Sequence, residues 1–125
     1  GLMTFLAHPG VPPDQGGVSP ASELGMGIHA GVDETSSMLH LAPELVDMAT
    51  ATRNVPESLA SNRHVRFGGA VGFGWLSNDF GPDGHIGDPT TATAQRGAEL
   101  FDAAVDAFCE ALGEVSAFEL PLVSR

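Results

Sequence analysis

The chain has 125 residues, 42% of them hydrophobic, which is enough for one soluble globular domain with a core. Its net charge of −11 repels phosphate backbones and argues against nucleic-acid binding. Because it contains no apolar run of about eighteen residues and no signal-peptide pattern, we expect a cytoplasmic protein without a membrane span.

The first segment predicts a strand followed by a long loop. Residues 2–7 form a short apolar run that closes at His8, which suits a buried parallel strand ending at a loop. His8 can serve as a ligand contact there or simply form part of a turn. Residues 9–27 are rich in Pro and Gly and predict an irregular loop, and loops of that length are usually functional or disordered.

A short helix is expected next. Asp33 and Thr35 can each cap its start, and Pro43 forbids its continuation. Its buried side is expected to consist of Met38, Leu39 and Leu41. In the mixed polar stretch that follows, we expect only a brief element at residues 45–48.

Residues 68–75 are dense in glycine and aromatic side chains. The Gly-x-Gly spacing at Gly72 and Gly74 lacks the strand–turn–helix context and third glycine of a dinucleotide site. Phe73 and Trp75 are expected in a core or a subunit contact rather than in a substrate stack.

The last predicted helix has the clearest pattern. Asp88 can cap its start, with Pro89 tolerated in the first turn, and Gly113 is expected to end it. Its apolar positions, spaced for one buried face, are Ala94, Ala98, Phe101, Val105, Phe108 and Leu112. Cys109 is the single cysteine, so it cannot form an internal disulfide, and we expect it in the core. Residues 114–125 can add a terminal strand or wrap the surface.

The strongest functional signal lies in residues 29–36. His29 and Glu34 are separated by a small-residue turn that leads into the helix, and such a pair is typical of a hydrolytic site. His29 suits a proton shuttle near neutral pH. Glu34 can be a metal ligand, can orient His29, or can interact with the helix dipole.

Other polar residues have simpler interpretations. Asp88 is most simply a helix cap and Asp83 a turn residue, while His40 and His64 are expected to be structural. The remaining polar candidates are Asp79 and His85.

Two blocks of this sequence resemble signatures of the creatininase family. From residue 29 the chain has His-Ala-Gly-x-x-Glu-Thr-Ser-x-Met-Leu, similar to the second signature of that family. Residues 80–90 are similar to its Pro-x-Gly-x-Ile-Gly-Asp-Pro block, and residues 94–97 are Ala-Gln-Arg-Gly where relatives have Ala-Glu-Lys-Gly. The resemblance implies an α/β three-layer sandwich with a mainly parallel sheet. Residues 1–125 would form the C-terminal half of that fold, as one domain or half-domain.

The resemblance also implies metal-dependent amidohydrolase chemistry. Family members bind a pair of divalent metals such as zinc and manganese, and metal-activated water attacks the carbonyl of a non-peptide or cyclic amide C–N bond. His29 would protonate the leaving nitrogen, and Glu34 would orient it or complete the metal shell. The Glu-x-His and Asn-Gly-His ligand blocks of the family are absent from this chain. We therefore expect the metals to be liganded mostly by an N-terminal companion half, without which this chain is inactive.

Substrate and assembly remain open at this stage. Creatinine-hydrolysing relatives have Trp-Asp-x-Glu immediately before the histidine, where this chain has Gly-Met-Gly-Ile at residues 25–28. This argues against creatinine and leaves other small-molecule amides, formamide-type groups and peptide bonds. By resemblance we expect an oligomer, such as the hexamer common in the family. The alternative is a non-catalytic subunit or remnant used for assembly.

Overall fold

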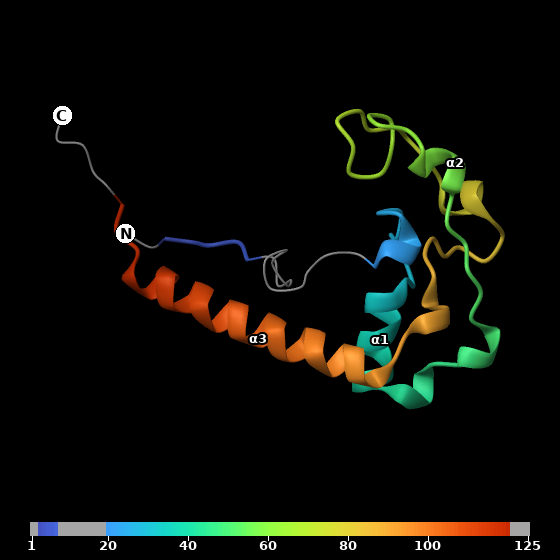
Figure 1. Cartoon of the computed structure of the whole chain (residues 1–125). Helices are drawn as coiled ribbons and strands as arrows, with labels where there is room; N and C mark the ends of the chain where they lie inside the picture. Colours follow the sequence, from blue (N-terminus) through green and yellow to red (C-terminus); the bar gives the residue numbers. More distant parts are fainter. Residues whose placement is uncertain (1–2, 8–19, 121–125) are drawn as a thin grey trace.

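The computed structural model describes residues 3–7 and 20–120. These residues form a small body from which one long helix extends (Figure 1). The α-helices are α1 (Val32–Leu41), α2 (Glu57–Ala60) and α3 (Ala94–Ala117). The 3-10 helices are η2 (Ala21–Glu23), η3 (Pro43–Leu45), η4 (Met48–Thr50), η5 (Ser77–Phe80) and η6 (Pro89–Thr91).

Helix α1 ends where the sequence predicts but begins differently. It stops at Leu41, just before Pro43, as expected. The predicted caps are wrong, because Asp33 and Thr35 both lie inside the helix and Gly31 occupies the N-cap position. The N–H of Val32 is instead satisfied from outside the helix, by the side chain of Glu23.

The expected parallel sheet is not formed by the described residues. They contain only isolated bridges, two antiparallel (His29 with Ile86 and Asn54 with Gly87) and one parallel (Val65 with Val71). The first two bridges place residues 86–87 between two segments that are far away in sequence. The sheet of the family fold therefore stays a prediction for the part of the chain that the structure describes.

The predicted N-terminal strand is not buried. Residues 3–7 are exposed, form no bridge, and lie beside the far end of α3 (Figure 1). The ring of Phe5 meets that of Phe118 edge-on, with centroids 5.6 Å apart. Most of the predicted loop at 9–27, and His8, lie outside the described residues.

Helix α3 begins later and ends later than expected. Asp88 does cap a helix, since its carboxylate accepts from the N–H of Thr90, but that helix is the short η6. The cap of α3 is Thr93, whose hydroxyl accepts from the N–H of Arg96 at 3.1 Å. Gly113 is not a C-cap, because the helix continues through it to Ala117.

The first turn of α3 crosses α1 at close range. A Cβ on Gly97 would lie 2.8 Å from the Cβ of His40 and closer still to the carbonyl oxygen of Ser36. Only glycine therefore permits this approach. Two side-chain contacts flank it: the Nε of Arg96 lies 3.0 Å from a carboxylate oxygen of Asp33, and the ring of His40 lies tilted against that of Phe101, with centroids 5.8 Å apart.

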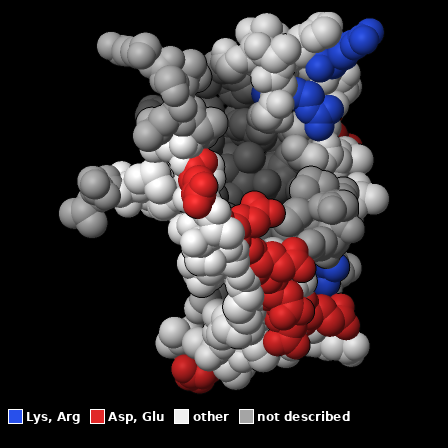
Figure 2. Space-filling view, turned by 90° about the vertical axis from the view of Figure 1, so that its left-hand side faces the viewer, with Lys and Arg blue, Asp and Glu red and all other residues white. Residues whose placement is uncertain are grey.

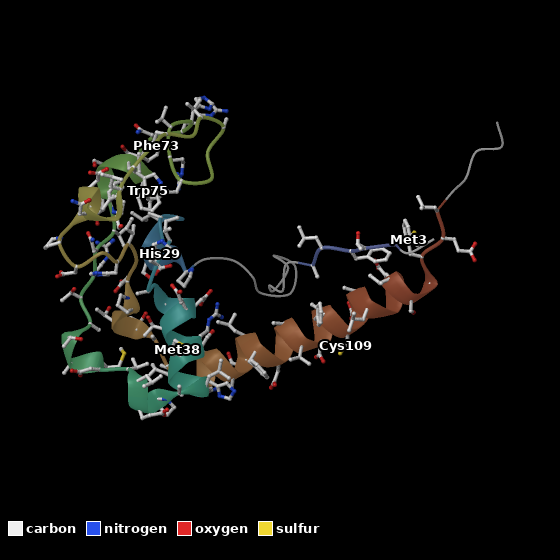
Figure 3. The ribbon with its side chains drawn as sticks, turned by 180° about the vertical axis from the view of Figure 1, so that it is seen from behind. Met3, His29, Met38, Phe73, Trp75 and Cys109 are labelled. Atoms are coloured by element: carbon white, nitrogen blue, oxygen red, sulfur yellow. The ribbon has the colours of Figure 1, made fainter. Side chains whose placement is uncertain are left out.

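Beyond this crossing, the apolar face of α3 is exposed. Phe101, Val105, Phe108 and Leu112 keep 40–50% of their surface accessible, although the sequence predicts them buried. Cys109, also predicted in the core, is exposed on the same outer part of the helix (Figure 3). The buried hydrophobic residues are few: Met26, Val32, Val55 and Ile86. The described residues thus leave the four side chains of this apolar face about half exposed, with His40 lying against Phe101.

Charge is unevenly distributed over the surface. Figure 2 shows Asp and Glu side chains gathered in a band over the lower part of one face, with Arg side chains mostly at its upper edge. No helix in the described segments is long and apolar enough to cross a membrane.

Candidate active site

The two signature blocks meet at His29. Its N–H donates to the carbonyl oxygen of Ile86 at 3.2 Å, and the N–H of Ile86 donates back to the carbonyl oxygen of His29 at 3.1 Å. Ile86 is fully buried, so this pairing fixes the His29 backbone against the core while its side chain stays exposed. Residues that are distant in the sequence thereby hold the imidazole in a defined place.

Glu34 closes the turn that follows His29. Ala30 has a φ of 53°, in the left-handed region that costs a residue with a Cβ about 1–2 kcal/mol. A carboxylate oxygen of Glu34 accepts from the N–H of Ala30 at 2.6 Å and so stabilises this conformation. No hydrogen bond joins the side chains of Glu34 and His29 among the described contacts. Glu34 therefore stabilises the turn that follows His29, while its predicted roles in orienting His29 and as a metal ligand stay predictions.

Glu23 is a structural part of the site that the sequence does not reveal. It is 4% exposed, and one of its carboxylate oxygens accepts from the N–H groups of Val32 at 2.9 Å and Asp88 at 2.8 Å. The carboxylate thus joins the start of α1 to the segment before η6. Its negative charge also interacts favourably with the positive end of the α1 helix dipole. Its partners lie 9 and 65 residues away, and no local pattern announces such a contact.

Glycines of both signature blocks make room for this carboxylate. A Cβ on Gly31 or on Gly27 would collide with the Glu23 carboxylate. A Cβ on Gly87 would lie 2.6 Å from the Cα of Gly31 and 3.1 Å from a carboxylate oxygen of Glu23. The close approach of the two blocks therefore requires glycine at residue 87, where the obstacle is the backbone of Gly31, whereas a side chain at residue 27 or 31 would displace the Glu23 carboxylate.

An open cleft of about 430 Å³ lies beside His29. Ala30, Glu34 and Thr35 line one side, and Val46 and Asp47, from the link between η3 and η4, line the other. Its volume is within the range of small-molecule sites. The cleft combines one imidazole, two carboxylates and an apolar wall that includes Met38 and Leu45.

An aromatic cluster stands on the other side of His29. The ring of Trp75 lies 6.4 Å from the imidazole, centroid to centroid, and Figure 3 shows Phe73, Trp75 and His29 in succession. Phe67 and Phe80 complete the cluster through contacts with Trp75 at 5.3 Å and 5.8 Å. Phe73 and Trp75 are part-buried, and the position of Trp75 makes it a candidate site residue that the sequence alone did not favour.

The other polar candidates are dispersed. Asp79 accepts from the N–H of Leu76 in a local turn, and Asp88 lies 3.6 Å from Arg53 in addition to capping η6. His85 donates through Nε2 to the carbonyl oxygen of Thr52 at 2.9 Å. Within residues 3–7 and 20–120, no three His, Cys, Asp or Glu side chains are arranged to hold a metal ion. The described residues therefore do not fit a complete metal centre.

Comparison with known proteins gives the family. The family model described as creatinine amidohydrolase matches residues 6–112, and the chain belongs to the creatininase family. It is 39% identical over 94 residues to the mycofactocin precursor peptide peptidase of Mycobacterium ulcerans (strain Agy99), covering 72% of this chain and 34% of that protein.

A solved structure agrees with this assignment. The fold resembles that of a Bacteroides fragilis NCTC 9343 protein named by inference as a creatinine amidohydrolase, with a TM-score of 0.55 and 26% identity. The match covers 78% of this chain and 38% of that one. The chain thus spans little more than a third of the length of these relatives. Hydrolases of this family bind divalent metal in general, and the relatives support a hydrolase of the amidohydrolase and peptidase type.

Proposed function

We propose that this chain supplies the proton-transferring part of a metal-dependent amidohydrolase that cleaves an amide C–N bond. The site is complete only with an N-terminal companion half, which holds most of the ligands of the zinc or manganese ions. The observation that carries the proposal is the pairing of His29 with Ile86, which brings the two family blocks together at an open cleft.

The role of His29 follows from its surroundings. Its backbone is held by Ile86 on one side and by the Glu34-stabilised turn at Ala30 on the other, while its ring faces solvent beside the cleft. Such an imidazole can deliver a proton to the departing nitrogen as the C–N bond breaks, a contribution of about 10²–10⁴-fold. Glu34 acts here as a positioning residue.

The exposed apolar face of α3 also supports the proposal of a companion half. Exposed apolar patches mark contact sites, and the apolar side chains of α3 from Phe101 to Leu112 keep 40–50% of their surface exposed among the described residues. A companion that covers this face would bury the stripe that the sequence pattern predicts as core. Assembly into a larger oligomer, such as a hexamer, is part of the same proposal.

The alternative is a non-catalytic subunit used for assembly. The exposed face of α3 favours it, as does the absence of a three-ligand metal group from the described segments. It predicts no metal and no turnover even with every partner present.

Native isolation followed by intact-mass and metal analysis tests both ideas. We expect a second polypeptide and bound divalent ions, and turnover of small-molecule amides, formamides or short peptides by that assembly. His29→Ala should lower kcat at least about 100-fold without changing the assembly. His64→Ala is the matched control, because His64 is exposed and lies outside the cleft. A metal-free assembly without turnover supports the alternative, and full activity in His29→Ala refutes the role of His29.

A further inference from the structure

A second open cleft adjoins the one beside His29. It measures about 420 Å³ and extends past Asp47 to Asp83 and His85. The two clefts share four lining residues, Ala30, Thr35, Val46 and Asp47. They are therefore neighbouring compartments along one surface, with His29 in the first and His85 in the second.

The polar groups of the second cleft are oriented by the backbone. His85 is fixed by its hydrogen bond to Thr52, which lines the same cleft. Asp47 accepts from the N–H of Ala49 at 3.0 Å through one carboxylate oxygen, and the second oxygen has no protein donor among the described contacts. The anchored imidazole and the capping carboxylate are thus held in place before any ligand arrives.

The charge of the paired clefts is of one sign. Their lining includes Glu34, Asp47 and Asp83, whereas neither contains a Lys or Arg side chain. These carboxylates disfavour an acidic ligand and favour a basic one.

The combined size of the two clefts also favours a longer amide substrate over a small one. A small cyclic amide at His29 fits within the first cleft and leaves the second empty, whereas an extended chain can occupy both. We propose that the Asp47–Asp83–His85 cleft is a subsite for an extended peptide substrate, taking a basic side chain next to the amide bond held at His29. This inference rests on the proposed hydrolase function, from which it takes the position of the amide bond.

Binding to the full chain can be measured without turnover. The probe is the capped pentapeptide acetyl-Gly-Gly-Lys-Gly-Gly-amide, compared with the same peptide carrying norleucine or glutamate at the centre, and with N-acetylglycinamide as a short amide. The readout is the imidazole NMR signals of His29 and His85, each assigned by its loss in a single-site variant. We expect the lysine peptide to shift both signals along one saturation curve and the short amide to shift only that of His29.

Charge variants test the specificity. Asp47→Asn with Asp83→Asn should weaken lysine-peptide binding about three- to tenfold and leave norleucine-peptide binding unchanged. Asparagine can still cap η4, so the fold is retained. Asp106→Asn on α3 is the control, since it removes an exposed carboxylate outside both clefts.

Each outcome decides the question. A lysine peptide that shifts neither signal or only one, or a glutamate peptide that binds equally well, overturns the subsite. Two shifted signals combined with no turnover in the native assembly uphold the subsite and refute the hydrolase function. Turnover of small amides without a His85 response upholds the function and refutes the subsite.

Discussion

Replacing Gly97 by alanine should separate α1 from α3. The added Cβ would lie 2.8 Å from the Cβ of His40, which is 0.6 Å short of the 3.4 Å where ordinary contact begins, and closer still to the Ser36 carbonyl. Both obstacles move only with the α1 backbone, so the overpacking cost should approach the upper end of about 1–3 kcal/mol. Alanine returns up to about 1 kcal/mol through helix propensity, which leaves a net loss of about 1–2 kcal/mol.

Gly113→Ala provides the matched comparison on the same helix. A Cβ at Gly113 meets nothing within 4 Å, so this variant should gain about 0.5–1 kcal/mol. The measurement is the free energy of unfolding from urea titration followed by helical circular dichroism. If both variants are stabilised equally, the close crossing at Gly97 is refuted.

Three further contacts around the site can be tested by substitution with the same unfolding measurement. Glu23→Ala should lower the free energy of unfolding by about 2 kcal/mol or more, because two buried N–H groups lose their acceptor. Glu23→Gln should cost less. Equal stability of the unsubstituted chain and both variants would contradict the bridging role of Glu23. Glu34→Ala should lower the free energy of unfolding by about 1 kcal/mol. Adding Ala30→Gly should restore most of this loss, because glycine adopts the left-handed conformation without strain. If the second substitution restores nothing, Glu34 does not stabilise the turn at Ala30. Arg96→Met should cost less than about 1 kcal/mol, since its pair with Asp33 is about one-third exposed on both sides, and a larger loss would show that the pair contributes more than a surface salt bridge.

Local signals in the sequence predicted the structure correctly where a single residue determines the start or the end of a helix. Pro43 ends α1 because it lacks the N–H that the next turn needs, and Asp88 caps a helix because its carboxylate reaches the second residue onward. Where several residues can play one part, the prediction failed. Asp33 and Thr35 were equally plausible caps, yet a carboxylate from η2 satisfies the helix start.

The buried face of α3 could not be predicted from periodicity alone. The pattern identifies which side of the helix is apolar, but it carries no information on whether the covering surface belongs to the same chain. Phe108 and Cys109 are exposed although the pattern predicts them buried, and residues 3–7 have an apolar sequence but form no sheet. The family blocks predict His29 as a catalytic residue, and this stays a prediction, whereas its backbone pairing with Ile86 required the structure.

The glycine-lined space around Glu23 links positions that lie far apart in the sequence. A side chain at residue 27 or 31 needs the volume that the carboxylate of residue 23 occupies, and one at residue 87 needs the volume of residue 31. A shorter residue at position 23 would free this space but leave the N–H groups of Val32 and Asp88 without an acceptor. We expect positions 23, 27 and 31 to change together among related sequences, with exchanges at residue 23 accompanied by new side chains at residues 27 and 31, whereas residue 87 should stay glycine because the backbone of residue 31 blocks a side chain there.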